Sequence, residues 1–270
     1  MSNSRPADTV ATPESKDRPL NSATLAVIQA QEPHHRQPLL FHNATIHTRD
    51  PLIGTIAQGD ILLGGPTIVG IGPGLIAAAG DDNMLVIDCS GLTVIPAVID
   101  ALSTSGVRAS RAESTGTLIP GRPADFILVE ESADQAYQSI LDDPSTAAAI
   151  VLGGEVRSWN GREPGPGNLP SNNLPSNGAP SDGPHSAAPV PAAPNLQGTW
   201  VSEDDFLHQH LLPAGRYDET RGGREHAFQG QYWINGNRID YLDDLGFWAY
   251  GEFIDDTLHH AGYIMRRPDS

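Results

Sequence analysis

The chain has 270 residues and a net charge of −17, because 33 acidic residues outnumber 16 Lys and Arg. This surplus of acid argues against nucleic-acid binding, which needs basic side chains for the phosphates, and against an anionic membrane surface as partner. Lys16 is the only lysine and lies in a polar segment, so Schiff-base chemistry and a Walker-type phosphate lysine are excluded. Cys89 is the only cysteine, which excludes an intrachain disulfide and a CxxC zinc site.

The first residues of the chain are polar. Residues 1–37 contain prolines and only one weakly apolar patch, Leu25–Ile28, so we expect disorder or at most a frayed helix. They lack the apolar stretch of a secretory signal, and no run of about 18 apolar residues predicts a membrane helix. We therefore expect a cytoplasmic protein.

From residue 38 the pattern changes to short β runs. Leu39–Thr48 alternates apolar and polar residues, and Gly59–Gly74 predicts a hairpin that turns at Gly64-Gly65. One helix is expected at Ser132–Leu141. Further strands are predicted at 84–88, 92–99, 125–130, 149–155 and 155–159. Short strands at regular spacing indicate a β-sandwich or partial barrel over residues 38–162.

The decapeptide GLTVIPAVID at Gly91–Asp100 resembles a motif of the amidohydrolase superfamily of metal-dependent hydrolases, G-x-x-V-x-P-G-x-I-D. Leu39–Gly74 resembles the opening of that family's composite β-domain. Gly116–Glu130 resembles its return from the catalytic TIM barrel, and Val151–Gly161 resembles its closing hairpin. The resemblance covers residues 39–162 and implies the composite β-domain.

The departures from the family motif decide the functional prediction. Leu102 and Thr104 stand where the resemblance implies the two metal-binding histidines, and 15 residues separate Asp100 from Gly116, far too few for a barrel. We therefore predict no catalytic residue, no metal and no cofactor. Without a barrel, apolar surface near Val94–Leu102 is expected to be exposed.

Three alternatives remain for this region. It is a scaffold without a site, a decayed or mis-assembled gene product, or a degenerate or partner-dependent hydrolase of carbon–nitrogen bonds. The last would need a partner protein that covers the β-domain. The imidazoles of His42 and His47, five residues apart on one strand, are expected on opposite faces and do not predict a metal site.

A low-complexity segment follows. Residues 163–195 hold nine prolines and the near repeat NLPSN-NLPSN. Such a composition cannot bury enough apolar surface to fold, so the segment is predicted to be a disordered linker.

The last segment, residues 196–270, is rich in aromatic residues. It contains 12 of the 16 aromatic residues of the chain, in short runs split by Gly, Asn and Asp. This pattern predicts a meander of short strands, and a closed antiparallel barrel removes the exposed edges of so small a sheet.

Several motifs in this segment are similar to a small family of Agrobacterium-type proteins of uncharacterised activity. They include LLPAGRYDE at Leu211–Glu219, RGGR at Arg221–Arg224, IDYLDD at Ile239–Asp244 and LHHAG at Leu258–Gly262. The resemblance spans residues 196–267 and implies a streptavidin-like or lipocalin-like β-barrel with a small-ligand role.

Aromatic walls with a few polar groups are typical of ligand pockets, and small barrels can hold one small ligand inside. The predicted ligand is a small, partly apolar or aromatic molecule. The alternative for each aromatic residue is an ordinary core position, and His259-His260 leaves open which imidazole faces inward. The candidate ligand-binding residues are Arg216, Tyr217, Arg224, Tyr232, Trp233, Tyr241, Trp248 and His259.

Overall fold

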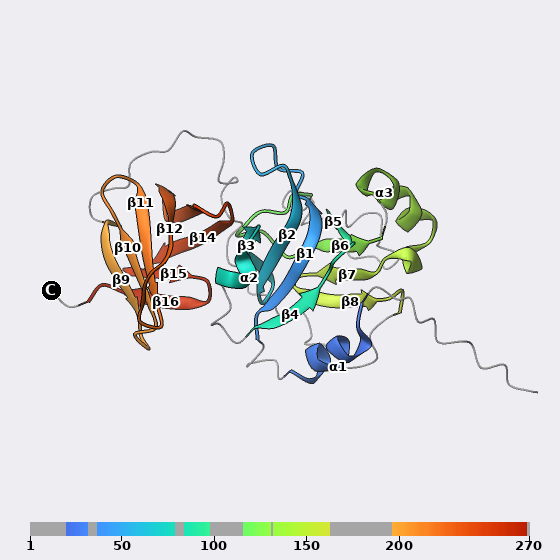
Figure 1. The fold of residues 1–270 in the computed structure, drawn as a ribbon, viewed down its shortest axis with the longest axis horizontal. Coiled ribbons are helices and arrows are strands. Elements are labelled where there is room, and N and C mark those ends of the chain that lie inside the picture. Colours follow the sequence, from blue (N-terminus) through green and yellow to red (C-terminus); the bar gives the residue numbers. More distant parts are fainter. Residues whose placement is uncertain are drawn as a thin grey trace, which may run out of the picture.

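The computed structural model describes residues 20–31, 37–78, 84–97, 116–130, 132–162 and 196–268. Strands dominate these residues and fall into an N-terminal β region (residues 37–162) and a C-terminal barrel (residues 196–268) (Figure 1). The prediction of a mostly-β chain is confirmed. The predicted linker at 163–195 lies outside the described residues, as do Leu102 and Thr104.

Eight strands form the N-terminal β region. They are β1 (Leu39–His47), β2 (Thr55–Gly64), β3 (Thr67–Gly72), β4 (Leu85–Asp88), β5 (Thr93–Pro96), β6 (Phe126–Val129), β7 (Ala149–Leu152) and β8 (Glu155–Trp159). Their order is β3-β2-β1-β5-β6-β7-β8, and β4 also pairs with β1. The predicted hairpin is β2–β3, and it turns at Gly65-Pro66, one residue later than predicted, because Gly64 still pairs with Thr67. Gly65 takes the positive φ of 62° that this tight turn requires.

The core of the N-terminal β region is largely aliphatic. Two fully buried rings, Phe41 and Phe126, meet edge to face with centroids 5.0 Å apart. Two buried acids here accept hydrogen bonds from backbone N–H groups. The Asp50 carboxylate accepts from two N–H groups of the turn that follows it, and the Asp60 carboxylate accepts from the Ile76 N–H. These carboxylates satisfy turns, which is the usual structural use of a buried Asp.

Helix α3 (Ala133–Asp142) confirms the predicted helix and leads into a short 3-10 turn, η2 (Pro144–Thr146). Its buried residues Ala136 and Ile140, one turn apart, pack in one cluster with Ile95 and Ala97. The expectation of exposed apolar surface from Val94 onward is therefore wrong for Val94–Ala97. The main N-terminal core buries Val94, and α3 and its neighbours bury Ile95 and Ala97. Residues 98–102 lie outside the described residues.

Residues 22–30 form helix α1 (Ser22–Ala30), which begins where the Asn21 side chain accepts from the Ala23 N–H. Leu25 and Ile28 pack against the N-terminal core. In this stretch the helical alternative predicted from the sequence therefore describes the chain better than disorder does. Residues 1–19 and 32–36 lie outside the described residues.

The barrel is an antiparallel meander of eight strands. They are β9 (Gly198–Ser202), β10 (Leu207–Leu211), β11 (Arg216–Arg221), β12 (Arg224–Asn235), β13 (Arg238–Asp243), β14 (Trp248–Ile254), β15 (Thr257–His260) and β16 (Tyr263–Arg266). Each strand pairs with the next, and β16 returns to β9 through Met265 and Ser202, which closes the sheet. The predicted closed antiparallel barrel is confirmed.

The two regions share hydrogen-bonded strands. Trp248 and Ala249 of β14 pair with Ile71 and Gly70 of β3. The pairing of β14 with β15 begins two residues later along β14, at Gly251. Close contact continues at Gly72, where an added Cβ would lie 2.4 Å from the Phe247 Cα. Short helix α2 (Leu75–Ala78) follows β3 and lies on the barrel side of the N-terminal β region (Figure 1).

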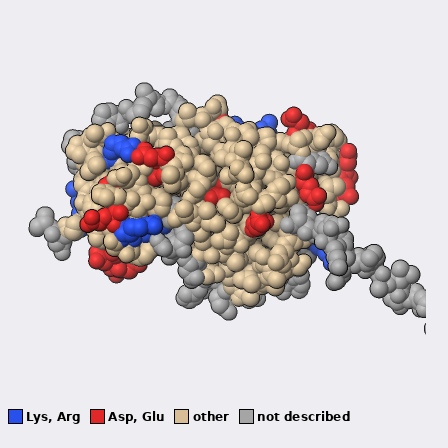
Figure 2. Space-filling view, viewed as in Figure 1, with Lys and Arg blue, Asp and Glu red and all other residues tan. Residues whose placement is uncertain are grey.

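Charged side chains are unevenly spread over the surface. On the face in Figure 2, Arg side chains lie beside acidic ones on the barrel, and the middle of the molecule is mostly uncharged. Within the described residues, no helix has the length and apolar character needed to cross a membrane.

Candidate functional site

A cavity of about 40 Å³ lies where the barrel meets the N-terminal β region. This volume exceeds the ~10–15 Å³ that a single water needs. Barrel strands supply the polar part of its wall, and β2, β3 and α2 supply apolar side chains. The lining residues are Leu62, Val69, Gly70, Leu75, Tyr217, Glu219, Arg221, Phe228, Tyr241, Phe247, Ala249, His260 and Ala261.

A buried ion pair forms one side of the cavity. Glu219 and Arg221 are two residues apart on β11, so both point into the barrel, and Arg221 Nε donates to Glu219 Oε1 at 2.9 Å. The guanidinium also lies over the Phe228 ring, 5.7 Å from its centroid. The two charges cancel, and the cavity wall gains no net charge from them.

His260 forms a second polar part of the wall. Its Nδ1 donates to the Tyr250 carbonyl oxygen at 2.7 Å, and its ring centroid lies 4.7 Å from that of Tyr241. Burial, with a smaller contribution from the nearby Arg221 charge, lowers the pKa of His260 to about 4. The imidazole is therefore neutral at physiological pH.

Some buried polar atoms of the barrel have no hydrogen-bond partner among the described residues. One is the Tyr241 hydroxyl, on a side chain that is 1% exposed. The others are both amide atoms of Gln209, a fully buried β10 residue directly opposite Glu219 on β11. An unpaired buried polar group costs about 1–3 kcal/mol, so these atoms need either a water or a ligand.

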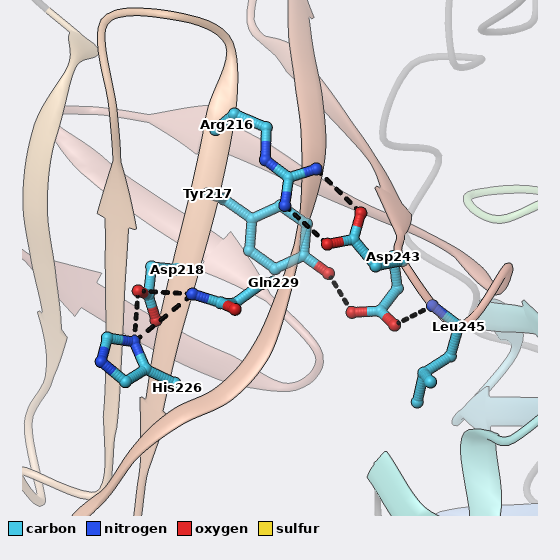
Figure 3. Close-up of polar contacts among 8 residues, drawn as sticks. Arg216, Tyr217, Asp218, His226, Gln229, Asp243 and Leu245 are labelled. Atoms are coloured by element: carbon cyan, nitrogen blue, oxygen red, sulfur yellow. Dashed lines mark hydrogen bonds and ion pairs between the residues drawn. The ribbon is translucent and has the colours of Figure 1, made fainter.

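Tyr217 and Asp243 form a buried pair beside the cavity (Figure 3). The Tyr217 hydroxyl donates to Asp243 Oδ2 at 2.8 Å, and the Leu245 N–H donates to Asp243 Oδ1 at 2.7 Å. Burial raises the pKa of both side chains, and the Asp243 charge further raises the pKa of the phenol. The proton therefore stays on Tyr217. The pair stabilises the fold through its hydrogen bond and does not donate a proton to the cavity.

The structure brings two of the eight predicted ligand residues, Tyr217 and Tyr241, to the cavity. Tyr232 is buried in the barrel core, and its hydroxyl donates to the Leu212 carbonyl oxygen at 2.8 Å. Trp233 and Trp248 meet edge to face with ring centroids 5.5 Å apart, and Trp248 lies at the junction with β3. These aromatic residues pack the barrel and its junction.

The three predicted cationic or imidazole residues lie away from the cavity. Arg216 makes two hydrogen bonds to the exposed carboxylate of Asp244, at 2.8 and 2.6 Å, which lower the pKa of that acid (Figure 3). Arg224 is exposed above the Phe228 ring. His259 contacts the Thr257 hydroxyl, because the alternation of β15 turns its neighbour His260 inward.

Sequence reasoning missed three polar residues of the barrel interior, Gln209, Glu219 and Arg221, and it left open whether His259 or His260 of β15 faces inward. The signal for the first three was present in the alternation of β10 and β11, where each shares a face with buried apolar residues such as Leu207 and Tyr217. Charged residues on a strand are usually solvent-facing, so alternation by itself did not single out these three.

The N-terminal β region offers less for chemistry. His42 Nδ1 lies 2.8 Å from Asp60 Oδ1; the His42 side chain on β1 is partly exposed and the Asp60 side chain on β2 is buried. Burial raises the pKa of Cys89 to about 12, so its thiol stays protonated. Across the described parts of the chain, no three His, Cys, Asp or Glu side chains gather as a metal would require.

Residues 194–267 match the model of a protein family described as Agrobacterium tumefaciens protein Atu4866. The solution structure of that Agrobacterium tumefaciens protein is 43% identical, and the match covers 30% of this chain and 100% of that one, with a TM-score of 0.27. The resemblance predicted for residues 196–267 is thus confirmed. No curated protein matches the chain.

Crystal structures of two triazine hydrolase variants match in part, each with 27% identity. The matches cover 23% and 24% of this chain, with TM-scores of 0.20 and 0.22. This chain spans only 13% and 14% of the length of those hydrolases. The predicted amidohydrolase resemblance is met by this partial match to a small part of the enzyme.

Proposed function

The chain belongs, through residues 194–267, to the family of the Agrobacterium tumefaciens protein Atu4866, and we propose that in this chain the barrel segment binds a small molecule. The ligand occupies the cavity between the barrel interior and the β3–α2 segment. The protein acts as a binding protein, and the N-terminal β region completes the wall of the site.

The observation that carries this proposal is the composition of the cavity wall. A small eight-stranded barrel has an interior just large enough for side chains to fill it, and apolar side chains would do so at least cost. Here an ion pair, a neutral imidazole and a phenol line a cavity instead. Buried polar groups that weaken packing are typical of sites kept for function.

The contribution of the N-terminal β region is apolar. Leu62 of β2, Val69 of β3 and Leu75 of α2 line the cavity and pack in one cluster with barrel residues. Ligand pockets commonly combine such apolar walls with a few polar groups that fix orientation. The β3–β14 pairing holds this wall in place, because it joins the two regions by backbone hydrogen bonds.

The test is a small-molecule screen of the full chain by thermal shift and by methyl NMR. In Val69→Phe, the larger ring fills the cavity, and the hits of the unmodified chain should be lost. Val86→Phe is the matched control, because Val86 is a strand residue 40% exposed on β4. Hits that survive Val69→Phe would contradict the proposed site, and a screen without hits would contradict the function.

A further inference from the structure

The charged groups of the cavity wall already have charged partners. Glu219 and Arg221 form their ion pair, and Arg238 forms another with Asp240 at 2.7 Å outside the cavity, where Arg238 also donates to the Pro120 carbonyl oxygen. A charged ligand would therefore meet no excess of opposite charge. Moving an ion out of water into such a site without a counter-charge is strongly unfavourable.

The remaining hydrogen-bonding capacity belongs to neutral groups. His260 donates through Nδ1 to the Tyr250 carbonyl, so the Nε2 of its neutral ring is an acceptor. The Tyr241 hydroxyl, which lacks a partner among the described residues, can donate or accept. Both rings line the cavity and lie side by side.

Gln209 adds a donor and an acceptor deeper in the barrel. Its carbonyl oxygen and its NH₂ group both lack partners in the described part of the chain. Gln209 is the cross-strand partner, on β10, of the cavity residue Glu219 on β11. A primary amide is best satisfied by a group that also donates and accepts at neighbouring atoms. The same is true of the mixed pair formed by His260 and Tyr241.

Resting on the proposed function, we infer that the ligand is uncharged and carries a hydrogen-bond donor next to an acceptor, as a carboxamide does, on a small apolar body. His260 and Tyr241, at the cavity wall, bind the polar end, and Gln209 lies next to the cavity residue Glu219. Leu62, Val69 and Phe247 enclose the apolar end.

Four probes with the same branched carbon body separate the chemical classes. Isobutyramide offers a neutral donor and acceptor, 3-methyl-2-butanone an acceptor alone, isobutyrate an anion and isobutylamine a cation. Each is titrated into the full chain, with the methyl resonances of Val69 and Leu75 as reporters. For a probe of six heavy atoms, a ligand efficiency of about 0.3 kcal/mol per atom corresponds to a Kd of about 50 mM, so the titrations extend to about 100 mM.

We expect isobutyramide to bind at least about tenfold more tightly than the other three probes. Tighter binding of isobutyrate or isobutylamine would overturn the uncharged class but leave the proposed function standing. If 3-methyl-2-butanone bound as tightly as isobutyramide, the inference that the ligand carries a hydrogen-bond donor would be overturned. If no probe moved the two methyl resonances, the proposed function itself would be contradicted.

Two variants test which groups read the ligand. Tyr241→Phe removes an unpaired hydroxyl at the cavity wall, so it should weaken isobutyramide binding by about tenfold without lowering the melting temperature. Gln209→Leu shows whether the amide next to Glu219 also takes part. Tyr137→Phe is the control, because it removes a hydroxyl that bonds to the Pro96 carbonyl far from the barrel. Unchanged affinity in both variants would show that ordered waters alone satisfy these atoms, and would overturn the inference.

Discussion

The N-terminal β region and the barrel bury polar groups in opposite ways. In the N-terminal β region, buried acids such as Asp50 and Asp60 accept from backbone N–H groups and hold turns at the edge of an aliphatic core. In the barrel, Glu219, Arg221 and His260 point into the interior and line a cavity. The first arrangement stabilises a scaffold, and the second gives up packing to create a polar interior.

This difference suggests a division of labour. The scaffold contributes shape and three apolar side chains to the cavity wall, whereas the barrel contributes every hydrogen-bonding side chain of that wall. A large apolar truncation should therefore be most costly in the N-terminal β region, and polar substitutions should matter most in the barrel. Four predictions test this contrast, from the largest expected effect to the smallest.

The largest effect is expected from Phe41→Ala. Phe41 is fully buried against Phe126, so the truncation should lower the free energy of unfolding by about 3–5 kcal/mol in urea denaturation. Phe228→Ala is the comparison in the barrel, and it should cost less because Phe228 already borders a cavity. Equal losses at the two positions would remove the contrast between the regions.

Arg221→Met should also destabilise the protein strongly. It leaves the Glu219 carboxylate buried without its partner at 2.9 Å, for which a loss of about 3–5 kcal/mol is typical. The double variant Arg221→Met with Glu219→Leu should recover most of that loss, because no uncompensated charge remains. A double variant as unstable as the single one would mean that the ion pair itself holds the barrel together.

His260 should make stability depend on acid pH. Its pKa in the folded protein, about 4, lies below the usual 6.5, so the folded state disfavours the charged imidazole. The free energy of unfolding is therefore unaffected by His260 above pH 6.5, and it falls by about 3 kcal/mol in total as the pH falls from 6.5 toward 4. The urea midpoint, measured across that pH window, should depend less steeply on pH in His260→Gln than in the unmodified chain.

The control for the pH experiment is His226→Gln, the same change at a side chain that is 68% exposed. If His226→Gln flattened this pH dependence as much as His260→Gln, the burial of His260 would not be its cause.

The smallest effect on stability is expected from Tyr241→Phe. The hydroxyl is buried without a partner among the described residues, so its removal should raise the free energy of unfolding by about 1 kcal/mol, the lower end of the cost of an unpaired polar group. Thermal melting of the ligand-free chain measures this. A clear loss of stability would reveal a structural hydrogen bond through water.

Much of the fold followed from local pattern. Alternation predicted β1, the Gly64-Gly65 turn predicted the β2–β3 hairpin, and α3 appeared at the predicted residues. The aromatic runs split by glycine predicted the barrel. These features depend on residues close together in the chain, whose periodicity and turn chemistry are visible in the sequence.

The site was predicted less well. The sequence singled out the barrel and two of its cavity residues, Tyr217 and Tyr241, but it emphasised Arg216 and Arg224, which lie outside. An arginine on a strand is usually solvent-facing, and only strand register reveals which of them is enclosed.

The sequence by itself determined that the chain is mostly β, that it ends in a barrel, and that one imidazole of the His259–His260 pair faces inward. Tertiary structure decided that this residue is His260, because the pairing of β14 with β15 fixes the register. It also placed Val69 and Leu75 against the barrel through the β3–β14 contact. That contact joins segments far apart in the chain, and no local pattern encodes it.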